Sequence, residues 1–285
     1  MKPAVVVVAF NSAGVLPRCL ASVVGADDVS DVVVVDNCSP DDSAEVAARA
    51  GARVVRAADN RGFGAGCNLG VEATNAGAVM FLNPDAAAGP GTVDGLARHL
   101  ESHPRAAVVA SSVRHPSGRP EPVRRRFPSV ARAALEPGLA ARLDERWYRR
   151  HARGRPQVDW VVAAAMLVRR TAFDAVGGFD ESFFLYCEEL DLCARLCDAG
   201  WEVHWVDGFP SSHESGTATR TLPGAGKVAW AEGFMRATRR HQRHPSLIRA
   251  SVVLGLGGRA VAWRVLGKRA RSRDWASAAR SALAG

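Results

Sequence analysis

Short runs of β-branched and other apolar residues alternate with amphipathic stretches over the first hundred positions of the chain. The apolar runs predict buried strands over residues 4–10, 32–36, 53–57 and 79–82. Apolar residues at helical spacing between these runs predict helices over residues 15–24, 41–50 and 63–75. Strands that alternate with helices in this way indicate an α/β fold with a parallel, doubly wound sheet.

Polar residues stand where each of these apolar runs ends. They are Asn11, Asp36, Asn60, Asn83 and Asp85. In a parallel sheet, ligands bind at the carboxyl edge of the strands. The sequence therefore predicts a ligand site built from these positions.

Periodicity is weaker in the middle of the chain. Residues 115–157 are rich in Arg, Pro and Gly, and we expect them to form a long surface excursion rather than core. Strands are expected again over 161–168 and 201–206, with a helix over 189–199 between them.

Acidic residues crowd behind an aromatic run within the segment 161–200. The acids are Glu188, Glu189 and Asp191, and the aromatic residues are Phe183, Phe184 and Tyr186. Burying a carboxylate is costly unless it is paired or bound to a metal. The crowding therefore predicts a site that holds a ligand or takes up a proton.

Three motifs in order along the chain carry a family resemblance. They are FLNPDA at 81–86, VVAAAMLVRRTAFDAVGGFDESFFLYCEELDLCAR from position 161 and SSHESG at 211–216. With them the chain resembles, from Ala4 to about Gly216, the family 2 inverting glycosyltransferases, especially the rhamnosyltransferase-like branch. The resemblance implies a GT-A type α/β fold with a Rossmann-like, mostly parallel central sheet flanked by helices. It also implies a glycosyltransferase core over residues 1–216, with a nucleotide-sugar-binding half at 1–110 and an acceptor half at 111–216.

The resemblance assigns a donor site for a nucleoside-diphosphate sugar. Its expected members are Asn11, Asp36, Asn60, Arg61, Gly62, Asn68, Asn83 and Asp85. Asp36 would bind the nucleobase, which favours UDP or dTDP, and the rhamnosyltransferase-like branch suggests a dTDP-6-deoxysugar such as dTDP-rhamnose. Asp85 and His213 would bind a divalent cation, Mn²⁺ or Mg²⁺, that stabilises the charge of the leaving diphosphate.

The acidic motif EELD aligns with the family's catalytic segment, in which the second acid takes the proton of the acceptor hydroxyl. That residue is Glu189, with one methylene more than the usual Asp, so the role could pass to Glu188. Acidic residues also stabilise helix N-termini, which is the structural alternative for both. We expect the acceptor to contact Trp160, Phe184 and Tyr186. Ala163 stands where the family commonly has Gly, which narrows the acceptor pocket.

Other readings of the motifs are weaker. The glycines of NRGFGAGCNLG at 60–70 run G-x-G-x-G after the third strand, unlike a dinucleotide fingerprint. Cys193 and Cys197 lie one helical turn apart, without a second ligand pair for zinc. A sugar nucleotidyltransferase would need a Gly-rich, basic triphosphate loop after the first strand, and a degenerate sugar-nucleotide-binding or scaffold protein is favoured only by the Glu at position 189.

Charge is distributed unevenly along the chain. From Ala218 onward, fourteen Lys or Arg stand against two acidic residues, a net charge of +12, whereas the whole chain carries +8. We therefore expect residues 217–285 to form a basic helical region that meets an anionic surface such as lipid headgroups. We do not expect nucleic acid as the partner, because we find no stacking motif.

The sequence carries two signals about membranes and location. We identify no secretory signal and expect a cytoplasmic enzyme, peripheral at the inner face of the membrane. The acceptor would then be a lipid-linked glycan, and a small natural product is the alternative. Arg259 and Arg264 interrupt the apolar stretch 251–267, so we expect an interfacial segment rather than a membrane span.

Overall fold

The computed structural model describes residues 1–152, 154–214 and 225–284. An eight-stranded sheet forms its centre, in the order β10-β13-β6-β12-β4-β1-β2-β3. The strands are β1 (Ala4–Ala9), β2 (Asp31–Asp36), β3 (Arg53–Arg56), β4 (Ala78–Leu82), β6 (Ala106–Ala110), β10 (Gln157–Val158), β12 (Ala165–Arg169) and β13 (Glu202–Trp205). The four N-terminal strands agree with the sequence prediction to within one residue at each end.

The sheet is mostly parallel, as predicted, and one central strand runs against its neighbours. Strands β1, β2, β3 and β4 are parallel neighbours, and β13 runs parallel to β6. Strand β12 lies between β4 and β6 and is antiparallel to both. A strand buried on both faces reads as a continuous apolar run whatever its direction, so its sequence did not reveal this. The sheet is therefore mixed but mostly parallel, as in the GT-A fold.

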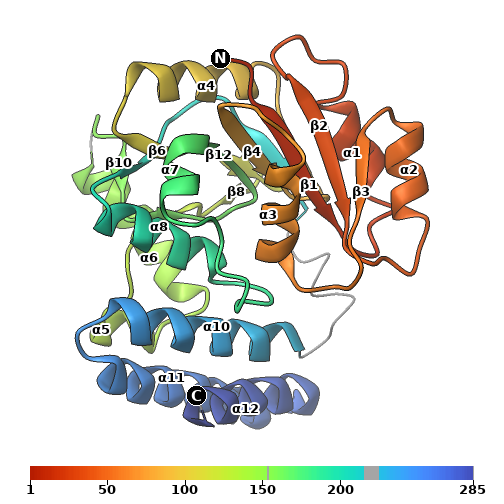
Figure 1. The fold of residues 1–285 in the computed structure, drawn as a ribbon. Helices are drawn as coiled ribbons and strands as arrows, with labels where there is room; N and C mark the ends of the chain where they lie inside the picture. The colour runs from red at the N-terminus through yellow and green to blue at the C-terminus, as the bar shows by residue number, and fades with distance from the viewer. Residues whose placement is uncertain (153, 215–224, 285) are drawn as a thin grey trace.

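Helices cover both faces of the sheet (Figure 1). They are α1 (Leu16–Ala21), α2 (Ser43–Arg49), α3 (Phe63–Glu72), α4 (Thr92–Ser102), α7 (Arg170–Ala175) and α8 (Glu188–Asp198). Alternate residues of β1 enter two separate cores: Val5 and Val7 pack with α1 and α4, whereas Val6 and Val8 pack with α3 and α8. This alternation follows from the two-residue period of a strand.

Residues 115–157 are not a surface excursion, so that expectation is wrong. The region and its neighbours contain β7 (Val113–Arg114), β8 (Pro120–Glu121), β9 (Arg124–Arg125), α5 (Val130–Ala133), α6 (Leu139–His151) and β11 (Trp160–Val161). The carboxylate of Asp144 is fully buried and accepts from Arg125 and Arg132, and Arg125 also binds Glu136 at 2.5 Å. Arg125 and Arg132, two of the arginines that suggested solvent exposure, are therefore partners of buried acids within the same segment.

Three C-terminal helices pack side by side against α8 and α5 (Figure 1). They are α10 (Ala225–His241), α11 (Pro245–Val265) and α12 (Arg269–Ala284). Helix α10 lies against α8, where His241 Nε2 binds Asp191 Oδ1 at 2.9 Å. The boundary expected at residues 216–217 falls outside the described residues. Among the described helices, none combines the length and apolar character needed to cross a bilayer.

Candidate donor and acceptor site

A cavity of about 660 Å³ opens at the carboxyl edge of β1, β2 and β4. Most of the residues predicted for the site line it: Asn11, Asn60, Gly62, Asn83, Asp85, Phe184, Tyr186, Glu188, Glu189 and His213. The loops after β1, β3 and β4 supply one wall, and the segment before α8 supplies the other. The structure thus brings the predicted donor, cation and base positions to one space.

Asp85 and His213 face one another across a small sheet. Strand β14 (Ser211–His213) pairs antiparallel with β5 (Ala86–Ala87), which sets His213 opposite Ala86. His213 Nε2 lies 3.2 Å from Asp85 Oδ1 and 3.4 Å from Asn83 Nδ2. The guanidinium of Arg18 and the backbone N–H of Glu214 both donate to the Asp85 carbonyl, so the turn that carries Asp85 is held from two sides.

The second nitrogen of His213 is held by a residue that no sequence motif indicated. His213 Nδ1 lies 2.9 Å from Glu121 Oε2. Burial disfavours a charged imidazole, but hydrogen bonds to Asp85 and Glu121 outweigh it and raise the pKa of His213 to about 9. A carboxylate behind a ligating histidine fixes the ring and its tautomer. One carboxylate and one oriented imidazole nitrogen at this separation suit a divalent cation completed by diphosphate oxygens.

Two carboxyl groups at the start of α8 face the same cavity. Glu188 is 4% exposed and Glu189 is 8% exposed, and within the described residues Oε2 of each finds no hydrogen-bond partner. Burial raises the pKa of both groups, and the charge of Glu189 raises that of Glu188 further. A buried carboxyl group with an unused oxygen is poised to accept a proton from a bound hydroxyl.

The backbone ahead of these acids is strained. Tyr186 and Cys187 both have φ = +70°, a left-handed conformation that costs free energy in residues other than glycine. Helix α10 presses on the same segment, because a Cβ at Gly233 would lie 2.4 Å from the carbonyl oxygen of Tyr186. The strain sets the direction in which α8 begins, and therefore where Glu188 and Glu189 point.

Gly62 joins the cavity wall that follows β3 to the wall that precedes α8. It has φ = +97°, and a Cβ there would lie 2.1 Å from the carbonyl oxygen of Phe184. The next residue, Phe63, donates its backbone N–H to that same oxygen at 3.0 Å. Glycine is thus needed both for its conformation and for the close approach of two chain segments.

Asn37 adds a contact that the sequence analysis missed. Its side-chain amide donates to Asn60 Oδ1 at 2.9 Å and to the Gly62 carbonyl at 3.0 Å. The neighbouring Asp36 is buried just outside the cavity lining, where its Oδ1 accepts from the backbone N–H of Ser39 at 3.4 Å. Asn37 stood beside Asp36 in the sequence, and its position at the end of a buried strand was the available signal.

Besides Asp36, three residues predicted for the site lie outside this cavity. Arg61 is exposed and pairs with Glu181 at 2.5 Å. Asn68 binds both the backbone N–H and the carbonyl of Phe179 through its amide group. Trp160 is buried and donates its indole N–H to the Arg126 carbonyl at 3.1 Å. The described contacts of Asn68 and Trp160 hold the fold together.

Helix α10, strand β1 and the loops around the site supply lining residues to which the sequence analysis gave no role. They are Val8, Phe10, Ser12, Pro84, Val162, Leu185, Ala225, Gly226 and Ala229, and Ala163 also lines the cavity. Most are apolar or small, so they give the cavity its shape rather than its charge. No sequence pattern distinguishes such residues from ordinary core.

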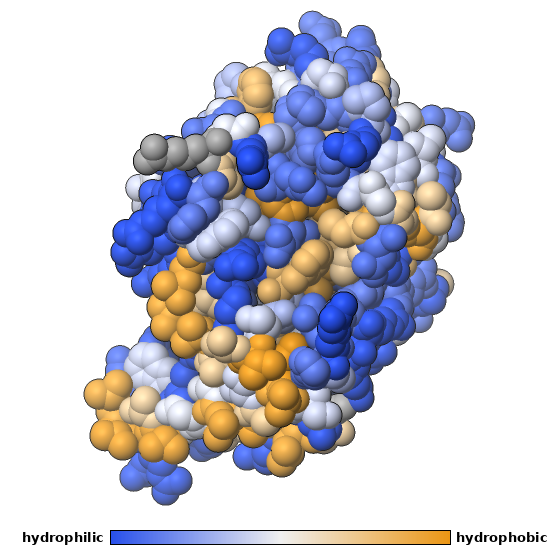
Figure 2. All heavy atoms as spheres, turned by 90° about the vertical axis from the view of Figure 1, so that its left-hand side faces the viewer, coloured by the Kyte–Doolittle hydropathy of each residue, from blue (hydrophilic) through white to orange (hydrophobic). Residues whose placement is uncertain are grey.

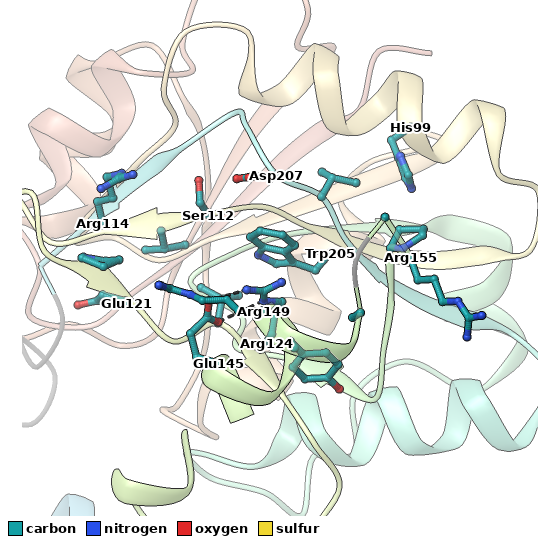
Figure 3. A pocket seen from close by; sticks show the side chains of 18 of the residues that line it. His99, Ser112, Arg114, Glu121, Arg124, Glu145, Arg149, Arg155, Trp205 and Asp207 are labelled. Atoms are coloured by element: carbon teal, nitrogen blue, oxygen red, sulfur yellow. Dashed lines mark hydrogen bonds and ion pairs between the residues drawn. The ribbon is translucent and has the colours of Figure 1, made fainter. Parts of the chain in front are cut away.

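A second cavity, of about 720 Å³, lies between β8, β9, α6 and the end of β13 (Figure 3). Arg124 crosses its floor, with its guanidinium 3.9 Å from the ring centre of Trp205 and 2.5 Å from Glu145. Arg149 binds the same Glu145 at 3.0 Å. Glu121 lines this cavity too, so a single carboxylate joins it to His213 of the first.

The family follows from comparison with known sequences. Residues 4–177 match the sequence profile of Glycosyl transferase family 2. The chain is a family 2 glycosyltransferase.

A curated relative agrees with the rhamnosyltransferase-like resemblance. This glycosyltransferase is 33% identical over 243 residues to the N-acetylglucosaminyl-diphospho-decaprenol L-rhamnosyltransferase of Mycobacterium tuberculosis, covering 77% of this chain and 78% of that protein. It is also 48% identical to the rhamnosyltransferase WbbL of Escherichia coli K12, over 56 residues that make up 20% of this chain and 21% of the relative.

Solved structures share the fold of this glycosyltransferase. The mannosyltransferase PcManGT of Pyrobaculum calidifontis, in complex with GDP-Man and Mn²⁺, has a TM-score of 0.63 at 14% identity and covers 99% of this chain and 85% of its own. Glucosyl-3-phosphoglycerate synthase of M. tuberculosis, with Mn²⁺ and UDP-Glc, has a TM-score of 0.59 at 20% identity, over 84% and 79% of the two chains. The GT-A fold predicted from the motifs is therefore confirmed.

Proposed function

We propose that this glycosyltransferase moves a 6-deoxyhexose, with rhamnose as the leading candidate, from its dTDP donor to a hydroxyl of a lipid-linked sugar. The observation that carries the proposal is that two buried carboxyl groups with unused oxygens share one cavity with the Asp85 and His213 pair. The identity of the sugar and of the acceptor is supported by the M. tuberculosis relative, whose name describes L-rhamnosyl transfer to a diphospho-decaprenol-linked sugar.

Asp85 and His213 would hold the divalent cation in this reaction. The cation supplies positive charge against the diphosphate, which lowers the barrier to its departure. Glu121 orients the imidazole through Nδ1, and the turn of Asn83 to Ala86 orients the carboxylate. Neighbouring fold relatives were solved with Mn²⁺, which supports a divalent cation of that kind.

Glu189 would act as the general base, with Glu188 as the alternative left open by the extra methylene. The acceptor oxygen attacks C1 of the sugar, its proton passes to the carboxylate, and the bond from C1 to the diphosphate oxygen breaks with its electrons on the diphosphate. Attack from the face opposite the leaving group inverts the configuration at C1. The carboxyl side chain is within the cavity that the donor would occupy, so the proton need not travel through solvent.

Asn11, Asp36 and Asn60 would surround the nucleoside, and Phe184 and Tyr186 would contact the acceptor. Phe184 is 50% exposed at the cavity, which leaves an aromatic face available for a sugar ring. Arg61, Asn68 and Trp160 contribute through the loops they hold.

The C-terminal helices would bring the enzyme to its lipid-linked acceptor. Along α11, apolar side chains that are more than half exposed recur on one side of the helix: Leu247, Leu254, Val261 and Val265. Figure 2 shows apolar side chains gathered at the end of the molecule that these helices build. Lys268, Arg269 and Arg271 follow at the turn into α12. An apolar strip beside cationic groups is typical of binding to an anionic membrane interface.

A donor and acceptor panel tests the proposed function. Transfer is measured with dTDP-rhamnose, UDP-glucose and GDP-mannose, with and without Mn²⁺, onto an N-acetylglucosaminyl-diphospho-prenol and onto a soluble N-acetylglucosaminide. We expect cation-dependent transfer from dTDP-rhamnose to the prenol-linked acceptor. Turnover of UDP-glucose alone would contradict the assignment of dTDP-rhamnose as the donor. Preference for the soluble acceptor would contradict the assignment of a lipid-linked acceptor.

A further inference from the structure

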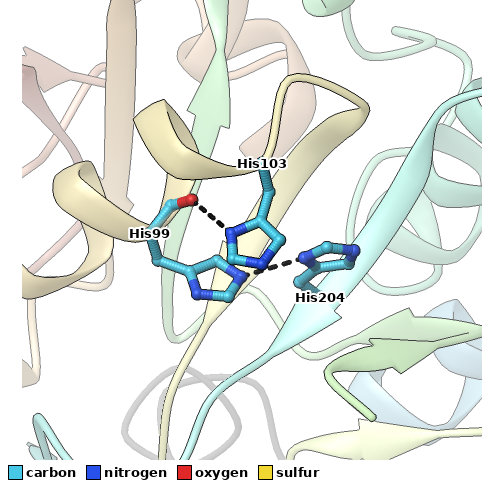
Figure 4. Close-up of side chains that lie close together, drawn as sticks. All are labelled: His99, His103 and His204. Carbon is cyan, nitrogen blue, oxygen red and sulfur yellow. Dashed lines mark hydrogen bonds between the residues drawn. The ribbon is translucent and has the colours of Figure 1, made fainter.

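Three histidines meet on the α4 side of the sheet, away from the donor cavity. His99 lies in the last turn of α4, His103 follows that helix directly, and His204 lies in β13. One ring nitrogen from each lies within 4.8 Å of the others (Figure 4). None of the three lines the cavity that holds Asp85 and His213.

Hydrogen bonds around this cluster leave one acceptor nitrogen of each ring on its inner side, where the rings of His99 and His103 stack with 3.9 Å between their centres. His204 Nε2 lies 3.0 Å from Glu202 Oε2, so its Nδ1 is the acceptor nitrogen, and it faces His99 Nε2 at 2.9 Å. His103 Nδ1 lies 2.9 Å from the His99 carbonyl oxygen, which leaves Nε2 as its acceptor nitrogen on the side of the other two rings (Figure 4). A carboxylate or carbonyl behind the outer N–H is the arrangement that orients ligating histidines.

Burial also acts on two of the three rings, those of His99 and His204. Burial, together with the proximity of His103 and His204, lowers the pKa of His99 to about 4. Burial likewise lowers the pKa of His204, although Glu202 opposes the shift. Both shifts disfavour a charged imidazole at these two positions.

We propose that His99, His103 and His204 bind a divalent transition metal ion, with Zn²⁺ as the best fit. Three imidazole nitrogens suit Zn²⁺, Cu²⁺ or Ni²⁺, whereas Mg²⁺ prefers oxygen ligands. The ion replaces the hydrogen bond between His99 and His204, and the proton of His99 moves from Nε2 to Nδ1. At Zn–N distances of about 2.0–2.1 Å, two ligating nitrogens stand about 3.3 Å apart, so the 2.9 Å contact opens only slightly.

The fourth ligand of this ion is water from the second cavity, because His99 and His103 both line that space. The ion ties the end of α4, which belongs to the donor half, to β13 of the acceptor half. Its consequence is stability: a ligand that binds only the folded chain raises the free energy of unfolding. Donor binding is not expected to change, since the donor cavity shares no residue with the cluster.

The test is a titration of the full chain, freed of any polyhistidine tag, with Zn²⁺ followed by calorimetry and with Co²⁺ followed by visible absorption. Besides the wild type, it uses His103→Gln and His204→Gln. Glu202→Gln probes the carboxylate behind His204. Two controls are His244→Gln, an exposed histidine elsewhere, and Asp85→Asn, which removes the other candidate cation site.

One tight equivalent is expected in the wild type and in both controls, with a rise in melting temperature. Loss of a ligand in His103→Gln should weaken binding by at least about 100-fold, and Glu202→Gln by about tenfold. Because His204 is buried, His204→Gln could misfold. His103 is partly exposed, so His103→Gln still tests whether the cluster binds the ion. Equal titrations for wild type and His103→Gln, or loss of the binding in Asp85→Asn, would overturn the proposal.

Discussion

His213 Nε2 lies 3.2 Å from Asp85 Oδ1, although the two residues lie far apart in the sequence. The contact exists because β14 pairs with β5, which places His213 beside the turn that follows β4. Two short strands thereby assemble a cation site from distant segments. Its geometry leads directly to the first prediction.

Substituting the residues of this pair should abolish cation-dependent donor binding. Asp85→Asn and His213→Gln each remove one proposed ligand, and we expect donor affinity in Mn²⁺ to fall at least about 100-fold. Glu121→Gln keeps both proposed ligands but removes the carboxylate that orients the His213 imidazole. It should lower donor affinity in Mn²⁺ by about tenfold to 100-fold. Calorimetry with dTDP-rhamnose measures this, and Asp94→Asn on the surface of α4 is the control. Unchanged affinity in Asp85→Asn would remove this residue from cation binding.

Kinetics should distinguish the roles of the two buried glutamates, Glu188 and Glu189. If Glu189 takes the proton, Glu189→Gln lowers kcat by about 10²–10⁴-fold while leaving donor affinity intact. Glu188→Gln should keep most of the activity under the same assignment. The two variants are matched, since both replace a buried carboxyl group at the first turn of α8. The reverse pattern would transfer the role of base to Glu188.

On acidification, kcat should begin to fall at a higher pH than it would if the base were an exposed glutamate. A base must be deprotonated to act, and burial raises the pKa of Glu189, so protonation inactivates it at a pH at which an exposed glutamate remains ionised. A pH profile of kcat, taken at saturating donor and Mn²⁺, measures the position of this limb. An acid limb at the pKa of an exposed glutamate would contradict the assignment.

Glu188 should make the fold less stable as the pH rises. The pKa of Glu188 is raised in the folded state, so the folded chain binds this proton more tightly than the unfolded chain does. The free energy of unfolding therefore falls as the pH rises from the unfolded pKa of Glu188 to its higher folded pKa. Glu188→Gln should therefore raise the melting temperature at pH 8 more than at pH 5. Thermal denaturation at both pH values checks this, and an equal effect at each would contradict it.

Gly62 should tolerate no side chain. An added Cβ meets the Phe184 carbonyl oxygen at 2.1 Å, and the backbone at φ = +97° disfavours any other residue. Gly62→Ala should push the two cavity walls apart and lower kcat/KM by more than tenfold, with a loss of melting temperature. Gly77→Ala is the matched control, since nothing lies within 4 Å of a Cβ there and its φ is not in the left-handed region. Full activity in Gly62→Ala would mean that the walls can separate without consequence.

The sequence predicted the parts of the site that depend on strand ends and missed those that depend on long-range pairing. Asn83 and Asp85 directly follow an apolar run, so their place at the sheet edge could be predicted. Glu121 could not, because only the pairing of β7 with β8 and β14 brings it to His213.

The same limit explains how the sequence misled about residues 115–157. Composition alone does not distinguish an arginine in water from one such as Arg125, whose partners Glu136 and Asp144 are buried beside it. Asn68 shows the converse case. A motif predicted it for donor binding, whereas its amide is engaged with the backbone of Phe179.

The C-terminal helices yield the last prediction. Val265 and Leu266 are 81% and 66% exposed and are followed closely by Lys268 and Arg269. Replacing both apolar residues by Asp should reduce binding to vesicles that contain an anionic lipid by at least about tenfold, because each buried Val or Leu side chain contributes about 1.5–3 kcal/mol. Wild-type binding should also weaken as salt is added, since screening reduces attraction between exposed charges.

Vesicle flotation measures this effect. Ala48→Asp on the exposed side of α2 serves as the control for added charge. Transfer to a soluble acceptor should stay unchanged in the Val265→Asp, Leu266→Asp variant, because the donor cavity is elsewhere, whereas transfer to an acceptor embedded in vesicles should fall with binding. Equal flotation of this variant and the wild type would show that the C-terminal helices do not form the membrane-binding surface.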